Sequence, residues 1–228
     1  VRTFNGDHLT LPGASAQITL QSHQKAGVWR ILQSPNTLLA HVVGAGKTFT
    51  MVAAGMESRR LGLSRKPMFV VPNHMLGQFS NELLALYPGA NILVAGKADF
   101  EAAHRQRLFS RIATGNWDAV IVTHSGFERI PISQDAQRQF LEEQLHELEM
   151  IKRQYADSSN RRLVKEIEKA KKRLEAKLQA LAADHKKDNT LTFEELGVDR
   201  IFVDEAHYFK NLFYVTKMTR IAGLPQTA

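Results

Sequence analysis

The sequence contains no cysteine, which excludes a disulfide framework and any metal site built on thiolates. It has no apolar run long enough to cross a bilayer, and its start does not resemble a signal peptide. Histidines such as His104, His146 and His185 lack the spacing of metal ligands, so we interpret them as surface residues. These absences predict a cytoplasmic protein that makes no use of a membrane.

What remains is ordinary for a soluble globular protein. Of the 228 residues, 43% are hydrophobic and 23% are charged, enough for one full core or one core with an appendage. The net charge of +7 weakly favours a polyanionic partner. The first residue is Val1, so we expect the chain to be a piece of a longer protein.

A phosphate-binding site is predicted between Leu38 and Thr48. We expect a short buried strand over Leu38–Val43, then a tight Gly44-Ala45-Gly46 loop, then a helix. The glycines permit close approach of the backbone to a phosphate, and the N-terminus of a helix favours anions. Lys47 would reach the β- and γ-phosphates of a nucleotide, and the hydroxyl of Thr48 would bind Mg²⁺.

A second stretch supplies acids. Three apolar residues, Ile201 to Val203, are followed by Asp204 and Glu205, which predicts a buried strand that delivers carboxylates at its C-terminal end. Asp204 would hold the Mg²⁺ shell, and Glu205 would orient and deprotonate the attacking water.

Each stretch has an ordinary alternative. His41 stands where the full P-loop pattern has glycine, so Gly-Lys-Thr could be a chance loop, and acids at strand ends are common. The two together are much rarer and predict a nucleoside triphosphatase. A kinase-type enzyme is disfavoured, because Glu205 beside a metal-binding Asp204 is a water-activating feature.

Strands and helices alternate along the chain, which predicts an α/β fold with a parallel sheet covered by helices on both faces. The expected helices and strands, besides those above, are helix 22–33, helix 48–60, strand 68–71, helix 76–87, strand 92–95, helix 99–113 and strand 119–123.

Three polar groups lie near the expected functional edge. Gln24 offers the donor and acceptor that the edge of adenine requires, although alone it could be an exposed helix residue. The loops Pro72-Asn73-His74 and Thr123-His124-Ser125 could contact phosphates. They could equally well cap helices, through Asn73 and Ser125 in particular. Neither loop reads bases, so any contact with DNA should be to its backbone and independent of sequence.

Residues 135–187 differ from the rest. Leucines and other apolar residues recur at steps of three and four, with a turn signal at 157–160, which predicts an inserted antiparallel coiled-coil hairpin with arms of about 30 Å. The domain prediction is thus a core over 1–134 and 188–228, interrupted by 135–187. The second arm is basic; we interpret this as a solvated face, with a grip on DNA or a partner domain as the alternative. Its basic residues are Arg161, Arg162, Lys165, Lys169, Lys171, Lys172, Arg173 and Lys177.

Taken in order, the motifs resemble helicase superfamily 2, and within it the Swi/Snf-type DNA translocases with a DEAH box. The surrounding sequence is most similar to the large helicase–methyltransferase proteins of phages and bacterial mobile elements. The matching segments are Gln24, Gly44-Ala45-Gly46-Lys47-Thr48, Val70-Val71-Pro72-Asn73, Val120-Ile121-Val122-Thr123-His124 and Asp204-Glu205-Ala206-His207-Tyr208-Phe209-Lys210-Asn211.

The resemblance implies a RecA-like first motor domain that couples hydrolysis of ATP, with Mg²⁺, to movement on DNA. His207 would couple the nucleotide state to the neighbouring motif. The positions that would touch the DNA backbone are Asn73, His74, Thr123 and His124. The remaining implied roles repeat those above: Gln24 for adenine, Lys47 and Thr48 for triphosphate and Mg²⁺, and Asp204 and Glu205 for metal and water.

Two parts of such a motor are missing from the sequence: the Ser/Thr-Ala/Gly-Thr motif after the DEAH box, and the second RecA-like domain with its arginine finger. An arginine finger supplies a factor of roughly 10³–10⁵ in related nucleotidases, so we expect this chain alone to bind nucleotide weakly and to hydrolyse ATP slowly. The second motor domain and a methyltransferase domain are expected elsewhere in the parent protein. Alternatives are the motor of a restriction enzyme and a nucleotide-gated binding module without hydrolysis.

Overall fold

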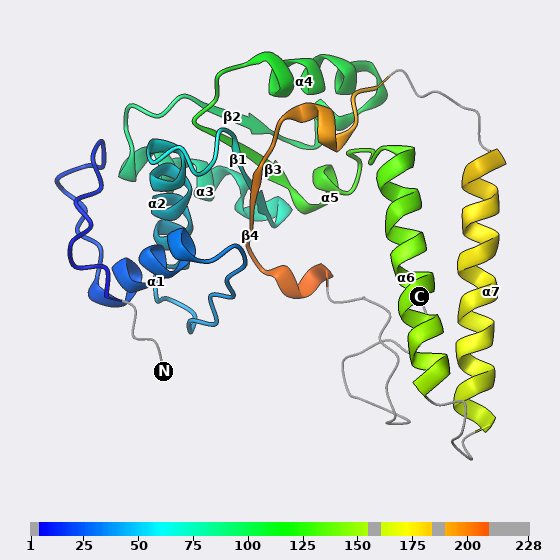
Figure 1. Cartoon of the computed structure of the whole chain (residues 1–228). Coiled ribbons are helices and arrows are strands. Elements are labelled where there is room, and N and C mark those ends of the chain that lie inside the picture. The colour runs from blue at the N-terminus through cyan, green and yellow to red at the C-terminus, as the bar shows by residue number, and fades with distance from the viewer. Residues whose placement is uncertain (1–4, 155–160, 184–189, 210–228) are drawn as a thin grey trace. The chain divides into compact units, whose positions relative to one another are not determined.

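Figure 1 shows a computed structural model of the chain, which describes residues 5–154, 161–183 and 190–209. Its contacts divide the chain into two compact units, residues 1–131 with 190–205, and residues 132–189 with 206–228. The first unit contains a sheet and the second a pair of long helices. In the part of the chain that the structure describes, no helix combines the length and the apolar character needed to cross a membrane.

The first unit is built on a parallel sheet of four strands in the order β2-β3-β1-β4. β1 and β3 lie in the middle and are buried at every residue, as strands covered on both faces should be. β2 and β4 are the edges. The bounds are β1 (Pro67–Val71), β2 (Ile92–Ala95), β3 (Ala119–Thr123) and β4 (Arg200–Val203). The predicted α/β fold with a parallel sheet is confirmed, and it is consistent with a RecA-like domain.

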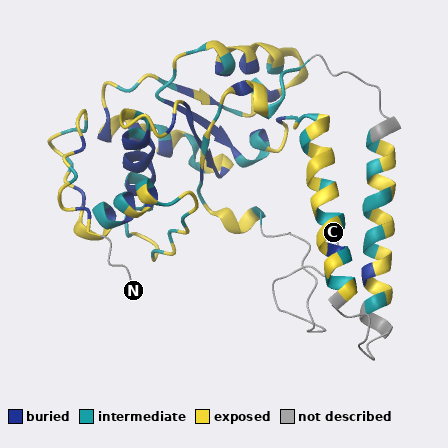
Figure 2. Ribbon diagram, viewed as in Figure 1, coloured by how far each residue is buried: buried dark blue, intermediate teal, exposed yellow. Residues whose placement is uncertain are grey.

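Helices flank this sheet. Three of them, α1 (Ser22–Gln33), α2 (Lys47–Arg60) and α3 (Leu76–Leu86), share one core with the sheet. Figure 2 shows that α2 is the most deeply buried of these. The remaining elements of this unit are α4 (Ala102–Thr114), α5 (His124–Phe127), and the 3₁₀ turns η1 (Asn73–Met75), η2 (Lys97–Phe100) and η3 (Phe193–Leu196). The single helix predicted over 99–113 is therefore η2 followed by α4, with Glu101 extended between them.

The core of this unit is centred on Phe69 of β1. Its ring stacks on Phe202 of β4 at 5.0 Å between centroids and lies 5.4 Å from Phe79 of α3. Gly55 of α2 faces the same cluster, and a Cβ built there would lie 2.6 Å from Phe69 Cζ. Glycine at this position therefore allows α2 to approach the β1–β4 pair closely.

The strand predicted over Leu38–Val43 is wrong. These residues form neither helix nor strand, and Leu38 and Val43 are 80% and 95% exposed. Only Leu39 of this run packs against the core. A strand needs backbone partners, whereas here the carbonyls of His41 and Val42 accept hydrogen bonds from Lys47 Nζ, at 3.2 and 3.4 Å.

The strand predicted at Ile201–Val203 is present, but it is not fully buried. Ile201 is 41% exposed, because β4 has β1 as its neighbour on one side and forms the edge of the sheet on the other. Its start is fixed by Asp199, whose carboxylate accepts hydrogen bonds from Ser64 Oγ at 2.5 Å, Arg65 N at 2.6 Å and Lys66 N at 3.1 Å. These bonds tie the residues before β1 to the residue before β4.

The second unit contains two helices, α6 (Gln134–Gln154) and α7 (Arg161–Ala183), and the 3₁₀ turn η4 (Ala206–Phe209). Lys152 pairs with Glu168 at 3.0 Å and Glu149 with Lys171 at 2.6 Å, so the residue numbers run in opposite directions and the helices are antiparallel. Leu148 and Ile167 are buried between them.

The basic residues of α7 whose side chains the structure describes are mostly exposed, as a solvated face requires: Lys165, Lys169, Lys172, Arg173 and Lys177. The predicted turn at 157–160 and the side chains of Arg161 and Arg162 lie outside the described residues. The first unit is interrupted between Pro131 and Thr190, and Phe193 N donates to Pro131 O at 2.7 Å, so the chain leaves and re-enters this unit at neighbouring points. The domain boundaries 1–134, 135–187 and 188–228 stay a prediction.

Replacing Gly55 with alanine should destabilise the protein by about 1–3 kcal/mol, because the added methyl group overpacks the contact with Phe69. The free energy of unfolding in urea measures this. Gly77→Ala is the matched control, since Gly77 lies on the exposed side of α3 with open space around it, and the substitution should leave stability equal or slightly higher. Equal effects of the two substitutions would contradict the packing assigned to Gly55.

Asp199→Asn should lower the free energy of unfolding at neutral pH by about 1 kcal/mol. The loss is no larger because the carboxylate is exposed and solvent weakens its hydrogen bonds. Burial works to raise the pKa of Asp199, but the hydrogen bonds from Ser64, Arg65 and Lys66 outweigh it and hold this pKa below its ordinary value. A lowered native pKa stabilises the fold above the unfolded pKa of about 3.9 and loses this contribution as the pH falls through the native pKa. The difference between wild type and variant should therefore shrink in acid, and a pH-independent difference would contradict this origin.

Candidate nucleotide-binding site

Two glycines shape the loop that enters α2. Gly44 and Gly46 have φ angles of +84° and +71°, in the left-handed region that favours glycine. Gly46 is the residue that precedes α2, and a Cβ there would collide with the side-chain amide of Gln24. Both glycines of the predicted loop thus adopt a conformation that a residue with a side chain rarely takes.

Lys47 and Thr48 are the first two residues of α2, a helix of 14 residues, so both side chains lie at its N-terminus. Lys47 Nζ lies within the loop and contacts the carbonyls of His41 and Val42. Thr48 is partly exposed, and its hydroxyl makes no hydrogen bond within the described residues. This arrangement leaves a cation, a hydroxyl and loop amides together, which are the groups that bind a triphosphate.

Two side chains at the start of α1 form hydrogen bonds with this loop. Gln24 is only 6% exposed; its Nε2 donates to Gly46 O at 3.1 Å, and its Oε1 accepts from Gln21 N at 2.8 Å. His23 Nε2 lies 2.9 Å from Ala45 O, to which it donates. Gln24 is therefore not the exposed helix residue that its sequence alone allowed. Its adenine-reading role stays a prediction, while its contact with the loop is a second role that no sequence pattern indicated.

The acids lie at the C-terminal end of β4. Asp204 N donates to Val70 O at 2.9 Å, which continues the β1–β4 pairing by one residue. Asp204 is half-buried, and its Oδ1 accepts from Glu205 N at 3.0 Å. Glu205 is exposed with φ of +49°, an uncommon conformation for a residue with a side chain.

Charges from three parts of the sequence act on Asp204. Burial raises its pKa above the ordinary value, and the negative charge of Glu205 adds to this. The backbone hydrogen bond from Glu205 and the charges of Lys47 and His124 oppose the rise. The charge of Lys47 thus acts on Asp204 although the two residues are far apart in the sequence.

Magnesium fits this edge in its ligand chemistry. Mg²⁺ is usually held by one or two carboxylates together with substrate phosphates and water. Thr48 offers a free hydroxyl and Asp204 a carboxylate oxygen beyond the one that accepts from Glu205 N. Among the described residues, no cluster of three or more histidine and acidic side chains forms a metal site by itself.

The four positions predicted to contact DNA divide into two kinds. Asn73 and His74 are exposed, in the turn after β1. Thr123 is 3% exposed, and its Oγ1 accepts from Gly126 N at 3.1 Å, so its hydroxyl caps α5. His124 Nε2 lies 2.9 Å from Asp204 O, to which it donates.

Ser125 connects the two loops, since its Oγ donates to Asn73 Oδ1 at 3.0 Å. The residue that caps a helix is therefore Thr123, whereas Asn73 and Ser125, for which capping was the alternative, bond to each other. Asn73 and His74 are exposed to a ligand. His207, predicted to couple nucleotide state to movement, lies in η4 of the second unit, where its ring stacks on Tyr208 at 4.5 Å.

Comparison with known proteins identifies a family. A family model described as a probable helicase domain matches residues 29–228. The chain belongs to this probable helicase domain family. It is also 23% identical, over 266 residues, to "Defense against restriction protein B" of Escherichia phage P1; the match covers 98% of this chain and 12% of that protein. The chain thus spans about an eighth of that relative.

Membership in the probable helicase domain family supports a helicase-like relation. The narrower placement in superfamily 2 with a DEAH box, and the link to methyltransferases, stay predictions. So do the roles assigned to single residues of the site.

In this helicase domain, the hydrogen bond from Gln24 of α1 to the glycine loop should strengthen the binding of any polyphosphate, with or without an adenine base. Replacing Gln24 with alanine removes the hydrogen bond to Gly46 O and should weaken binding of inorganic tripolyphosphate about three- to tenfold, the scale of one neutral hydrogen bond. Isothermal titration calorimetry with tripolyphosphate and with ATP separates the two roles of Gln24. A loss confined to ATP would show that Gln24 reads adenine and does not brace the loop. Gln33→Ala, at the exposed end of the same helix, is the control.

Proposed function

We propose that this domain is the ATP-binding first motor domain of an ATP-dependent DNA translocase or helicase. The observation that carries the proposal is that His124, which follows β3, donates to the carbonyl of Asp204, which follows β4, while the charge of Lys47 at the start of α2 acts on the Asp204 carboxylate. In open α/β sheets, ligands bind at the carboxyl ends of the strands.

Each residue has a role that follows from its chemistry. Lys47 and the loop amides would hold the β- and γ-phosphates of ATP, while Gln24 keeps the loop in shape and would contact adenine. Thr48 and Asp204 would hold Mg²⁺, which neutralises charge on the phosphates when bound. Glu205 would orient a water for in-line attack on the γ-phosphorus and accept its proton, with ADP as the leaving group.

Coupling to DNA has a structural candidate. His124 contacts the carbonyl of the metal-binding candidate Asp204, and its neighbour Ser125 contacts Asn73. A change in the position of Asp204 on hydrolysis could therefore reach Asn73 and His74, which we propose contact the DNA backbone independently of sequence. The second motor domain and a methyltransferase domain of the parent are part of the same proposal, as is a source in a phage or bacterial mobile element. The phage relative supports that source.

Two other functions use the same site. The motor of a restriction enzyme would carry the same residues, and nuclease activity of the full-length protein would distinguish it. A nucleotide-gated binding module would bind ATP without turning it over. The presence of Lys47, Thr48, Asp204 and Glu205 together favours hydrolysis, because such a module has no need of all four.

Glu205→Gln in the full-length protein should lower DNA-stimulated ATP turnover by about 10²-fold or more, the scale of a general base, and leave nucleotide binding intact. Turnover is measured with duplex, with single-stranded DNA and without DNA. Glu128→Gln, an exposed glutamate of the same unit, is the matched control and should retain full activity. Wild-type protein that binds ATP but shows no turnover with either DNA would overturn the motor and favour the gated module.

A further inference from the structure

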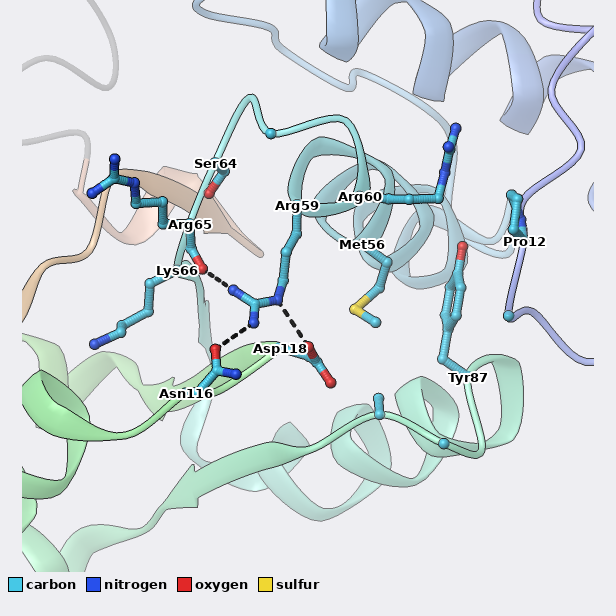
Figure 3. A pocket seen from close by; sticks show the side chains of 14 residues that line it. Pro12, Met56, Arg59, Arg60, Ser64, Arg65, Lys66, Tyr87, Asn116 and Asp118 are labelled. Atoms are coloured by element: carbon cyan, nitrogen blue, oxygen red, sulfur yellow. Dashed lines mark hydrogen bonds and ion pairs between the residues drawn. The ribbon is translucent and has the colours of Figure 1, made fainter.

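A cavity of about 740 Å³ lies at the opposite edge of the sheet from the glycine loop (Figure 3). It is bordered by the end of α2, the loop that leads into β1, the turn after α3 and the residues just before β3. None of the residues assigned above to nucleotide, magnesium or DNA lines it. Its size falls within the range of small-molecule sites in proteins.

Tyr87 supplies the first sign that this cavity binds something. The residue is 3% exposed and lines the cavity, yet its hydroxyl has no hydrogen-bond partner within the described residues. Burial, and secondly the charge of Glu57, raises the pKa of Tyr87, so the phenol stays protonated and remains a donor. A buried donor without an acceptor is unfavourable in a fold and favourable for a ligand that brings one.

Cationic side chains predominate in the lining of the cavity, while the charge nearest in effect to the Tyr87 hydroxyl is the negative one of Glu57, followed by that of Arg60. The lining includes four cationic side chains and one carboxylate, Asp118. Arg60 is held by the buried Glu57 through its Nε and Nη2, at 2.8 to 3.1 Å, which fixes its guanidinium beside the cavity and leaves further N–H groups. In Figure 3 the Tyr87 hydroxyl points toward α2, between Arg60 and Met56.

The far end of the cavity carries a second cation. Arg59 spans the floor, where it donates to Asp118 at 2.8 Å and to Asn116 at 2.7 Å, and also to the carbonyl of Arg65. The side chain of Arg65 itself is exposed and makes no hydrogen bond or ion pair within the part of the chain that the structure describes. Figure 3 shows it at the opposite end from Tyr87.

We propose that this cavity is a second ligand site, separate from the glycine loop, for a small phosphorylated molecule. Its phosphate accepts hydrogen bonds from Tyr87 and Arg60, and a further acceptor group of the ligand faces Arg65. Guanidinium groups match the geometry of phosphate oxygens, and Met56 and Pro12 give the ligand an apolar wall. Met56 lies beside the hydroxyl in Figure 3, and in the proposed complex this flexible side chain turns aside so that the phosphate reaches the hydroxyl.

A small molecule fits this site better than a nucleic-acid strand. A strand is bound mainly through exposed cations on a surface that its backbone follows. The Tyr87 hydroxyl is buried, so a strand that follows the surface does not reach it.

The test is calorimetric titration of pyrophosphate into protein carrying Lys47→Ala, so that the glycine loop does not contribute. Tyr87→Phe in this background should weaken binding about tenfold while leaving the melting temperature without ligand unchanged or higher, because it removes a donor that has no partner. Arg65→Gln should weaken binding more than Arg107→Gln, an exposed arginine outside the cavity that undergoes the same change of charge.

Three results would overturn the proposal: no saturable binding of pyrophosphate, equal affinity of Tyr87→Phe and its parent, or equal effects of Arg65→Gln and Arg107→Gln. Displacement of pyrophosphate by a short single-stranded oligonucleotide would also overturn it and assign the cavity to a nucleic-acid backbone. Because the Lys47→Ala background disables the glycine loop, none of these results depends on the motor proposed above.

Discussion

The pairing of β4 with β1 is the constraint on which the candidate site depends. These strands come from residues more than 130 apart in sequence, and Asp204 N extends the pairing to Val70 O. Phe202 stacked on Phe69 fixes the pair from within the core, Gly55 lets α2 approach it, and Asp199 secures its start. Because α2 carries Lys47 at its first residue, this packing brings the lysine toward the acids of β4. A shift of β4 by one residue would turn Phe202 away from the core and move Asp204 away from Lys47.

The glycine loop depends on a different support. It is not the continuation of a strand, since Leu38–Val43 lies outside the sheet. Its shape is maintained instead by Gln24 and His23 of α1 on one side and by Lys47 on the other, each bonded to a loop carbonyl. A loop held by side chains rather than by a strand can change shape when a phosphate competes for Lys47. The groups that hold the loop are thus the groups that would respond to a nucleotide.

Much of the fold could be predicted from the sequence. Continuous apolar runs such as those of β1 and β3 indicate central strands of a parallel sheet, and both are buried throughout. Leu38–Val43 has a similar composition but pairs with no strand. The pairing of a segment with a distant strand cannot be predicted from the local pattern of apolar residues. The contacts of Gln24 with Gly46 and of His124 with Asp204 were unpredictable for the same reason, because each joins residues at least 22 positions apart. Helix capping was predicted as an alternative for the loop that contains Thr123, but Thr123 was not the residue expected to provide it.

The central claim is that the edge formed by Lys47, Thr48 and Asp204 binds Mg·ATP, and hydrogen exchange measured with and without Mg·ATP tests it most directly. The account predicts slower exchange of backbone amides in residues 44–50 and around Asp204 on addition of Mg·ATP, and no such protection in the Lys47→Ala variant. Protection confined to other regions, or protection that survives Lys47→Ala unchanged, would contradict it.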